Sequence, residues 1–136
     1  MRQAHRRGQT LIEMALALPI LLTLVVGLFS VGQILLTHYA VSQAARAAAH
    51  QAALTGGNRT VTETAARQAL TGSLGIEPTA SEVVISCPRQ PCRRYDPITV
   101  EVRYRAALWV PVALLPFGDE IVVRARATRA AERDQQ

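Results

Sequence analysis

The side chain of clearest chemical meaning in this sequence is Glu13, a carboxylate that directly precedes a long apolar run. The run, Met14 to Leu36, contains no charged residue, and as a helix it reaches about 34 Å, enough to cross a hydrocarbon core of about 30 Å with some tilt. On insertion scales an unpaired carboxylate costs about 2.5–3.5 kcal/mol at the middle of a bilayer. We therefore expect Glu13 either to snorkel to the headgroups or to pair with a cation from a partner.

The two cysteines, Cys87 and Cys92, are separated by four residues. A zinc site needs four ligands, the usual redox pair has C-x-x-C spacing, and the histidines lie far away in the sequence. The favoured interpretation is a structural disulfide in a loop between two paired strands. In the chain-entropy model so short a loop contributes about 2 kcal/mol, so the bond is expected to pin a loop without holding the fold together.

The remaining polar residues form no catalytic constellation. No histidine follows His50, no Gly-rich phosphate loop follows a predicted strand, and the acids show no motif spacing. Because the basic residues are scattered, the net charge of +5 does not indicate a nucleic-acid partner. We predict a protein that is not an enzyme and that uses no metal, no cofactor, no nucleic acid and no small-molecule substrate.

Arginines mark the topology of the apolar run. Arg2, Arg6 and Arg7 stand before it, whereas the stretch 37–57 beyond it has Arg46 as its single arginine. By the positive-inside rule this asymmetry places the N-terminus in the cytoplasm and the residues after about position 37 outside, where disulfides persist. The run is also longer than the about 7–15 apolar residues of a cleaved signal peptide, so we expect it to remain as an anchor.

The apolar helix is expected to continue outside the membrane. Residues 37–54 are dominated by alanine and contain no helix breaker before Gly56 and Gly57. The result is one rod of about 45 residues and about 65 Å, with a kink at Pro19. The alanine surface of its outer half permits close packing against another helix.

A small second helix and a sheet are predicted after this rod. Thr60 and Glu63 have the spacing of a capping box with Thr60 as the N-cap, so a short helix is expected from Val61 to Thr71. Strands are then predicted at residues 82–86, 98–105 and 121–128. The fold class is therefore α+β and membrane-anchored: a long N-terminal transmembrane helix that continues outside, a short helix, and a small, mainly antiparallel three-stranded sheet.

The last two predicted strands alternate apolar and polar residues, which indicates a sheet with one wet face. On that face we expect cross-strand ion pairs, such as Glu101 with Arg124 or Arg126. Between these strands, residues 106–117 are apolar, but at about 18 Å they are too short to span a membrane. They cover the sheet, rest on the membrane interface or dock a partner, and the sequence leaves the three alternatives open.

These signals divide the chain into five segments. They are a cytoplasmic leader-like segment 1–8, a transmembrane helix 9–36, an Ala-rich helix extension 37–57, a small extracytoplasmic α+β domain 58–128, and a charged tail 129–136. We expect the tail to fray because it is short, charged and terminal.

Several of these features together resemble one family. The stretch from Arg6 to Glu13 (RRGQTLIE), the pair Leu18 and Pro19, and the run AARAAA at 44–49 resemble the TadE-like pseudopilins of the tight-adherence (Flp, type IVb) pilus assembly system. The strand ITVEV at 98–102, the LLP turn and the last strand are similar to that family's outer part. The resemblance spans nearly the whole chain, and the N-terminal motif is its specific portion.

The resemblance implies a single-pass protein of the bacterial inner membrane, pilin-like in fold, that assists pilus assembly as a minor pilin or pseudopilin. In that family a prepilin peptidase cuts after a glycine, and the fifth residue of the mature chain is Glu. The matching positions are Gly8, Gln9 as the new N-terminus, and Glu13, which is followed by Met14 where an aromatic residue is usual. The implied partners are the prepilin peptidase, pilin and other pseudopilin subunits.

A cut after Gly8 also has a physical consequence that fits this interpretation. It removes three arginines, takes the formal charge from +5 to +2, and leaves an α-amine at the membrane boundary. That cation can pair with Glu13 of an adjacent subunit and set an axial register between neighbouring helices. The alternative is an unprocessed, membrane-anchored scaffold or binding module of the cell envelope in which Glu13 only snorkels.

Overall fold

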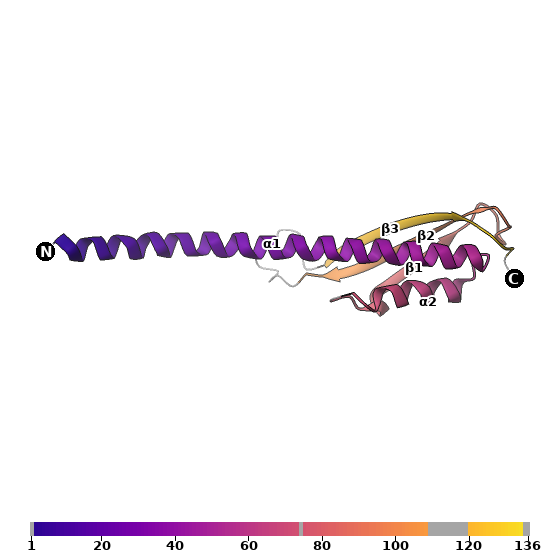
Figure 1. Ribbon diagram of the computed structural model, residues 1–136, viewed down its shortest axis with the longest axis horizontal. Helices are drawn as coiled ribbons and strands as arrows, with labels where there is room; N and C mark the ends of the chain where they lie inside the picture. Colours follow the sequence, from indigo (N-terminus) through magenta and orange to yellow (C-terminus); the bar gives the residue numbers. More distant parts are fainter. Residues whose placement is uncertain (1, 74, 109–119, 135–136) are drawn as a thin grey trace.

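The structure is a computed structural model that describes residues 2–73, 75–108 and 120–134, with side chains described from residue 11 onward. Its elements in chain order are α1 (Arg2–Leu54), α2 (Arg59–Leu70), the short 3-10 helix η1 (Pro78–Ala80), β1 (Ser81–Ser86), β2 (Pro97–Ala107) and β3 (Glu120–Ala130). Figure 1 shows α1 as a rod that extends well beyond the rest of the molecule, with α2 and the sheet alongside its C-terminal half. The predicted fold class is confirmed.

Helix α1 is continuous over 53 residues, which corresponds to about 80 Å and exceeds the predicted length. Pro19 lies inside it, yet Figure 1 shows the rod without a sharp bend, so the predicted kink is wrong. The helix absorbs the single lost backbone donor without breaking. It stops where predicted, because Gly56 and Gly57 adopt positive φ values of 64° and 85° and the Gly57 N–H donates to the Ala52 carbonyl at 2.7 Å.

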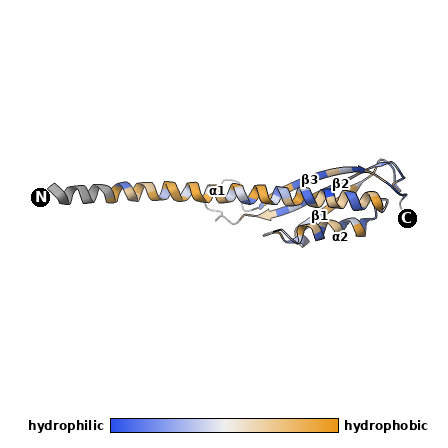
Figure 2. Ribbon diagram, viewed as in Figure 1, coloured by the Kyte–Doolittle hydropathy of each residue, from blue (hydrophilic) through white to orange (hydrophobic). Residues whose placement is uncertain are grey.

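The two halves of α1 differ in what surrounds them. Between Leu11 and Leu36 nearly every side chain is exposed, and Leu28 and Phe29 are each 73% exposed. From residue 11 onward, the first buried side chain is Thr37, the residue after the predicted end of the transmembrane segment. Residues 11–36 are called the bare half of α1 below, and Figure 2 colours much of this segment in the orange of apolar residues. Among the described helices, α1 alone is long and apolar enough to cross a membrane.

The Ala-rich half of α1 forms the centre of the outer domain. Its fully buried residues fall at helical spacing and pack against α2 and the sheet of the same chain. They are Val41, Ala44, Ala45, Ala48, Ala49, Ala52 and Ala53. The close packing predicted for this alanine surface is therefore satisfied within one chain, because small side chains let α2, β2 and β3 approach the helix axis.

The start of α2 differs from its prediction. Asn58 is the N-cap, with its Oδ1 accepting from the Val61 N–H at 3.3 Å, so the capping box predicted at Thr60 is wrong. Glu63 does not reach back to the Thr60 amide but accepts from Arg59 Nε at 2.7 Å, one turn earlier on the helix. This charged pair competes for the carboxylate on which a capping box depends.

The sheet has the order β1-β2-β3 with both pairs antiparallel, as predicted. Along β2 the side chains of even-numbered residues from Ile98 to Ala106 are buried, and their odd-numbered neighbours lie on the outer face. The register places Val83 opposite Val102 and Val100 opposite Ala127. The predicted wet face is confirmed. Of the apolar segment 106–117, residues 109–117 lie outside the described residues.

The segment expected to fray is largely part of the fold. Strand β3 continues to Ala130, and Ala131 is buried and exchanges hydrogen bonds with the loop before β2. The Ala131 N–H donates to the Asp96 carbonyl at 2.8 Å, and the Glu132 N–H donates to the Ala53 carbonyl at 2.8 Å. These long-range backbone bonds fix residues 131–132 against the end of α1, a restraint that the local sequence does not encode.

Candidate functional site

The N-terminal motif lies on the free end of the rod. The backbone of Gly8, Gln9 and Glu13 belongs to one uninterrupted helix, so Glu13 lies about 6 Å, one turn, beyond Gln9. The Glu13 side chain is exposed, and no side chain in the described part of the chain forms an ion pair or hydrogen bond with it. Any stabilising cation must therefore come from the extreme N-terminus, the headgroups or another molecule.

The arginines predicted to set the topology, Arg2, Arg6 and Arg7, lie in the first turns of the same helix. Their side chains are outside the described residues. The structure thus keeps the processing and topology residues together at the end of the rod that is farthest from the outer domain (Figure 1).

Among the described residues, the side chain of Gln33 connects the outer domain to the apolar half of the rod. Gln33 Nε2 donates to the Ala107 carbonyl at 2.9 Å, at the last residue of β2, which pairs with Glu120 at the start of β3. Gln33 belongs to the predicted transmembrane segment, so this end of the sheet lies level with the last turn of that segment. Within the described residues, the outer domain therefore begins beside the end of the predicted transmembrane segment.

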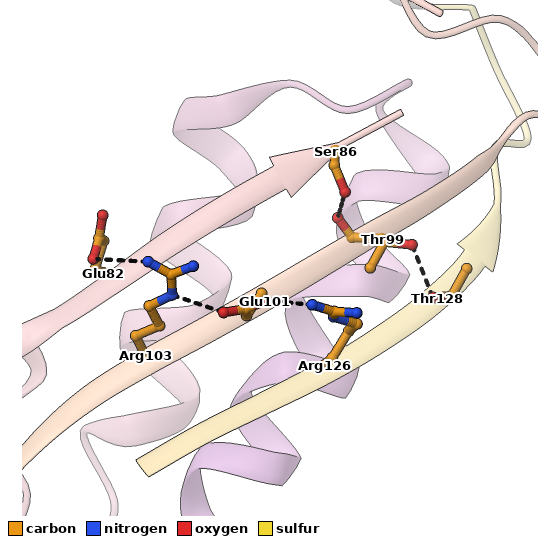
Figure 3. A network of polar contacts seen from close by, with 7 residues as sticks. All are labelled: Glu82, Ser86, Thr99, Glu101, Arg103, Arg126 and Thr128. Carbon is orange, nitrogen blue, oxygen red and sulfur yellow. Dashed lines mark hydrogen bonds and ion pairs between the residues drawn. The ribbon is translucent and has the colours of Figure 1, made fainter. Parts of the chain in front are cut away.

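The outer face of the sheet carries a polar network centred on Glu101 (Figure 3). Glu101 accepts from Arg103 Nε at 2.7 Å and from Arg126 Nη2 at 2.8 Å, and Glu82 lies 4.0 Å from Arg103. The pair predicted between Glu101 and Arg126 is confirmed, and the alternative with Arg124 is not formed. The two hydrogen bonds, from Arg126 and then from Arg103, lower the pKa of Glu101 to about 2.

This network is structural in character. It links β1, β2 and β3, and Figure 3 shows a separate contact between the hydroxyls of Thr99 and Thr128 on the same face. These two hydroxyls are 2.9 Å apart. The Glu101 side chain is only 14% exposed, whereas its partner Arg126 is 69% exposed. The carboxylate therefore anchors two guanidinium groups that would otherwise repel each other across β2 and β3.

The predicted disulfide between Cys87 and Cys92 is confirmed in the loop between β1 and β2. Cys92 is buried at 5% exposure, and a Cβ added to Gly57 would lie 3.0 Å from its Sγ. The disulfide therefore packs against the turn that ends α1, a contact that the sequence did not predict. Glycine is needed at position 57 for this space as well as for its positive φ.

Three features define the class of this protein: the bare apolar half of α1, the carboxylate near its start, and the sheet packed on its other half. It is a membrane-anchored α+β protein in which the anchor helix also forms the centre of the outer domain. Residues 8–50 match the model of the family described as TadE-like protein. The match identifies this region as TadE-like and confirms the resemblance there. It covers the motif, the bare half and most of the docked half of α1, and ends before α2. Searches of curated proteins and of solved structures gave no match.

Proposed function

We propose that this chain is a minor pilin or pseudopilin that assists assembly of a type IVb (Flp/Tad) pilus or a related secretion apparatus. In this proposal it is a non-enzymatic, single-pass protein of the bacterial inner membrane, with a cytoplasmic N-terminus and an extracytoplasmic domain. A prepilin peptidase cuts it after Gly8, and it then contacts pilin and other pseudopilin subunits. The observation that carries the proposal is the pairing of a bare apolar helix with a Glu13 that has no partner among the described side chains.

The bare half of α1 supports a role in assembly because it has so few contacts of its own. A helix segment with few contacts to the described elements of its own chain offers its surface to lipid or to other helices. A carboxylate near the boundary gives that association a fixed height, since the new α-amine of a neighbour can pair with it in a medium of low dielectric constant. Helix packing then provides affinity, and the charge pair provides register.

The docked half of α1 supports the same role because it transmits that register outward. The core residues from Val41 to Ala53 hold α2 and the sheet directly on the rod, and Gln33 holds the near end of the sheet. A subunit whose Glu13 is fixed in height therefore presents its outer domain at a fixed height as well. The unprocessed scaffold, in which Glu13 only snorkels, gives no such fixed relation between neighbours.

Thiol crosslinking between co-expressed copies tests this proposal. The cysteines belong at Gln43 and His50, which are exposed on one face of α1, because the buried positions Ala45 and Ala48 are occupied by the chain's own core. Glu13→Gln keeps the size of the side chain and removes its charge, so crosslinking and piliation are expected to fall while membrane insertion is retained. Glu120→Gln, an exposed acid on the outer domain, is the matched control.

Two results would contradict the proposal. Equal crosslinking and equal piliation in the wild type and Glu13→Gln would remove the pairing mechanism. N-terminal mass analysis in cells that express the peptidase is expected to give a chain that starts at Gln9. A chain that retains residues 1–8 in piliated cells would favour the unprocessed scaffold.

A further inference from the structure

The end of the outer domain farthest from the bare helix carries an open cavity of about 630 Å³. Its lining includes Ala53 at the end of α1, Arg94 and Tyr95 from the loop before β2, and Arg129 and Glu132 from the C-terminal end of the chain. The bond between the Glu132 N–H and Ala53 places this cavity about 30 Å along α1 from Gln33. Figure 1 shows the C-terminal end of β3 at the end of the molecule opposite the start of α1.

Tyr95 adopts a backbone conformation that its residue type disfavours. The Asp96 N–H donates to the Arg93 carbonyl at 3.0 Å, and Tyr95 has a φ of 71° at the third position of this turn. Glycine or asparagine normally occupies that position in a type II turn. Tyr95 is 73% exposed, so its burial does little to offset the strain. Strain of this kind at an exposed aromatic residue points to a contact outside the chain.

The charges around Tyr95 are predominantly free guanidinium groups. Arg93, Arg94, Arg129 and Arg133 are all exposed, and none of their side chains forms a hydrogen bond or ion pair within the described chain. The Arg94 guanidinium carbon lies 5.0 Å from the centroid of the Tyr95 ring. This contact holds one guanidinium group next to the ring at the mouth of the cavity.

The nearby acids are engaged differently. Asp96 Oδ2 accepts the Arg93 N–H at 3.1 Å, and Asp134 Oδ1 accepts the Arg94 N–H at 2.8 Å, so both carboxylates shape the loop. Glu132 forms no side-chain hydrogen bond or ion pair within the described residues, and it lines the cavity together with Arg94 and Arg129. The cavity therefore presents two guanidinium groups, one aromatic ring and one free carboxylate.

We infer that this cavity is a docking site for a carboxylate-rich segment of a partner protein. Arginine and tyrosine are the side chains that most often anchor protein interfaces, and guanidinium groups bind carboxylates with two parallel hydrogen bonds. Glu132 favours a polypeptide over a uniformly anionic polymer, because it repels a row of like charges but accepts a cation or donor placed among carboxylates. The inference goes beyond the proposed function, since it requires only the outer domain and its orientation away from the bare helix.

The test uses the purified full chain in detergent micelles and an array of peptides about 12 residues long. Each peptide rich in Asp and Glu has a twin in which those residues are Asn and Gln. The chain is expected to bind acidic peptides that also contain a Lys or Arg, and to lose about tenfold in affinity for their neutral twins. Oligogalacturonate, a carbohydrate polyanion, serves as the competing probe and is expected to bind more weakly.

Variants separate the site from general charge effects. Arg94→Gln and Arg129→Gln are each expected to weaken peptide binding about tenfold, whereas Arg124→Gln, on the outer face of the sheet, makes the same charge change and leaves it within about twofold. Tyr95→Gly is the sharpest variant because it relieves the turn. It is expected to weaken binding about tenfold while the thermal midpoint stays the same or rises.

Four outcomes would overturn the inference. The first is equal binding of acidic peptides and their neutral twins, and the second is that the chain binds no acidic peptide of the array. The third is full binding of the peptide by Tyr95→Gly, and the fourth is binding of oligogalacturonate that equals or exceeds that of the best peptide. The last outcome would identify an anionic polymer as the ligand. Glu132→Gln provides a further check, since it is expected to narrow the preference for the peptide over oligogalacturonate.

Discussion

Ala48→Leu tests whether the alanine face of α1 is the core of its own outer domain or a surface for other subunits. Ala48 is completely buried in the cluster that also contains Val100 and Val102, so three added carbon atoms have no free volume to enter. Overpacking of this kind costs about 1–3 kcal/mol. For a domain of this size the thermal midpoint then falls by about 4–24 °C, at about 4–8 °C for each kcal/mol.

The assay is thermal unfolding of the full chain in detergent micelles, followed by near-ultraviolet circular dichroism. Tyr104 reports on the core, because the residue is 4% exposed and its hydroxyl accepts from the Glu77 N–H at 3.1 Å. Ala47→Leu, the same change at a half-buried neighbour on α1, is the matched control and is expected to shift the midpoint far less. Equal midpoints for wild type and Ala48→Leu would refute the packing described above and would leave the alanine face free for other subunits.

Three further predictions concern the outer domain, each measured by the same thermal unfolding. Glu101 has a folded pKa lowered to about 2 from an ordinary value of 4.5, so its stabilising contribution is complete above pH 4.5 and is lost as the pH falls toward about 2. Glu101→Gln is expected to flatten the fall in midpoint across that window, and an unchanged slope would contradict the pairing with Arg126. Asn58→Ala is expected to lower the free energy of unfolding by about 1 kcal/mol because the N-cap is lost, and Thr60→Ala is expected to lower it by less. A larger effect of Thr60→Ala than of Asn58→Ala would instead support the capping box. Gly57→Ala is expected to destabilise the domain in the oxidised protein, because its Cβ meets Cys92 Sγ and its φ is positive, and a neutral effect would contradict that contact.

Local signals were sufficient for much of the fold. The run without breakers and the Gly56–Gly57 pair predict the continuous course of α1 and its C-terminal end, since both depend on backbone preferences of the residues themselves. The alternation of apolar and polar residues from Ile98 onward gives β2 and its wet face in the same way. Period and breaker signals are properties of neighbours in sequence, and the structure agrees with them.

Features that depend on competition between nearby side chains or on distant partners were missed. The capping box at Thr60 failed because Arg59 competes for Glu63 and Asn58 is available two residues earlier. The end of the chain reads as a charged tail, yet backbone bonds to Ala53 and Asp96 hold it in place. For Tyr95 the sequence signal is weak, because a tyrosine between arginine and aspartate does not by itself predict a positive φ.

Glu13, Gln33 and Ala53 mark fixed positions along the axis of α1. Glu13 and Gln33 are about 30 Å apart along the helix, which equals the thickness of a typical hydrocarbon core, and Gln33 is where the sheet is fastened. Ala53, where the C-terminal end of the chain is fastened, lies about 30 Å farther along the same helix. Because no flexible linker interrupts this helix, a change in the height of Glu13 in the bilayer moves the sheet and the distal cavity by the same amount. Under the proposed function, a charge pair at Glu13 therefore aligns the outer domains of neighbouring subunits.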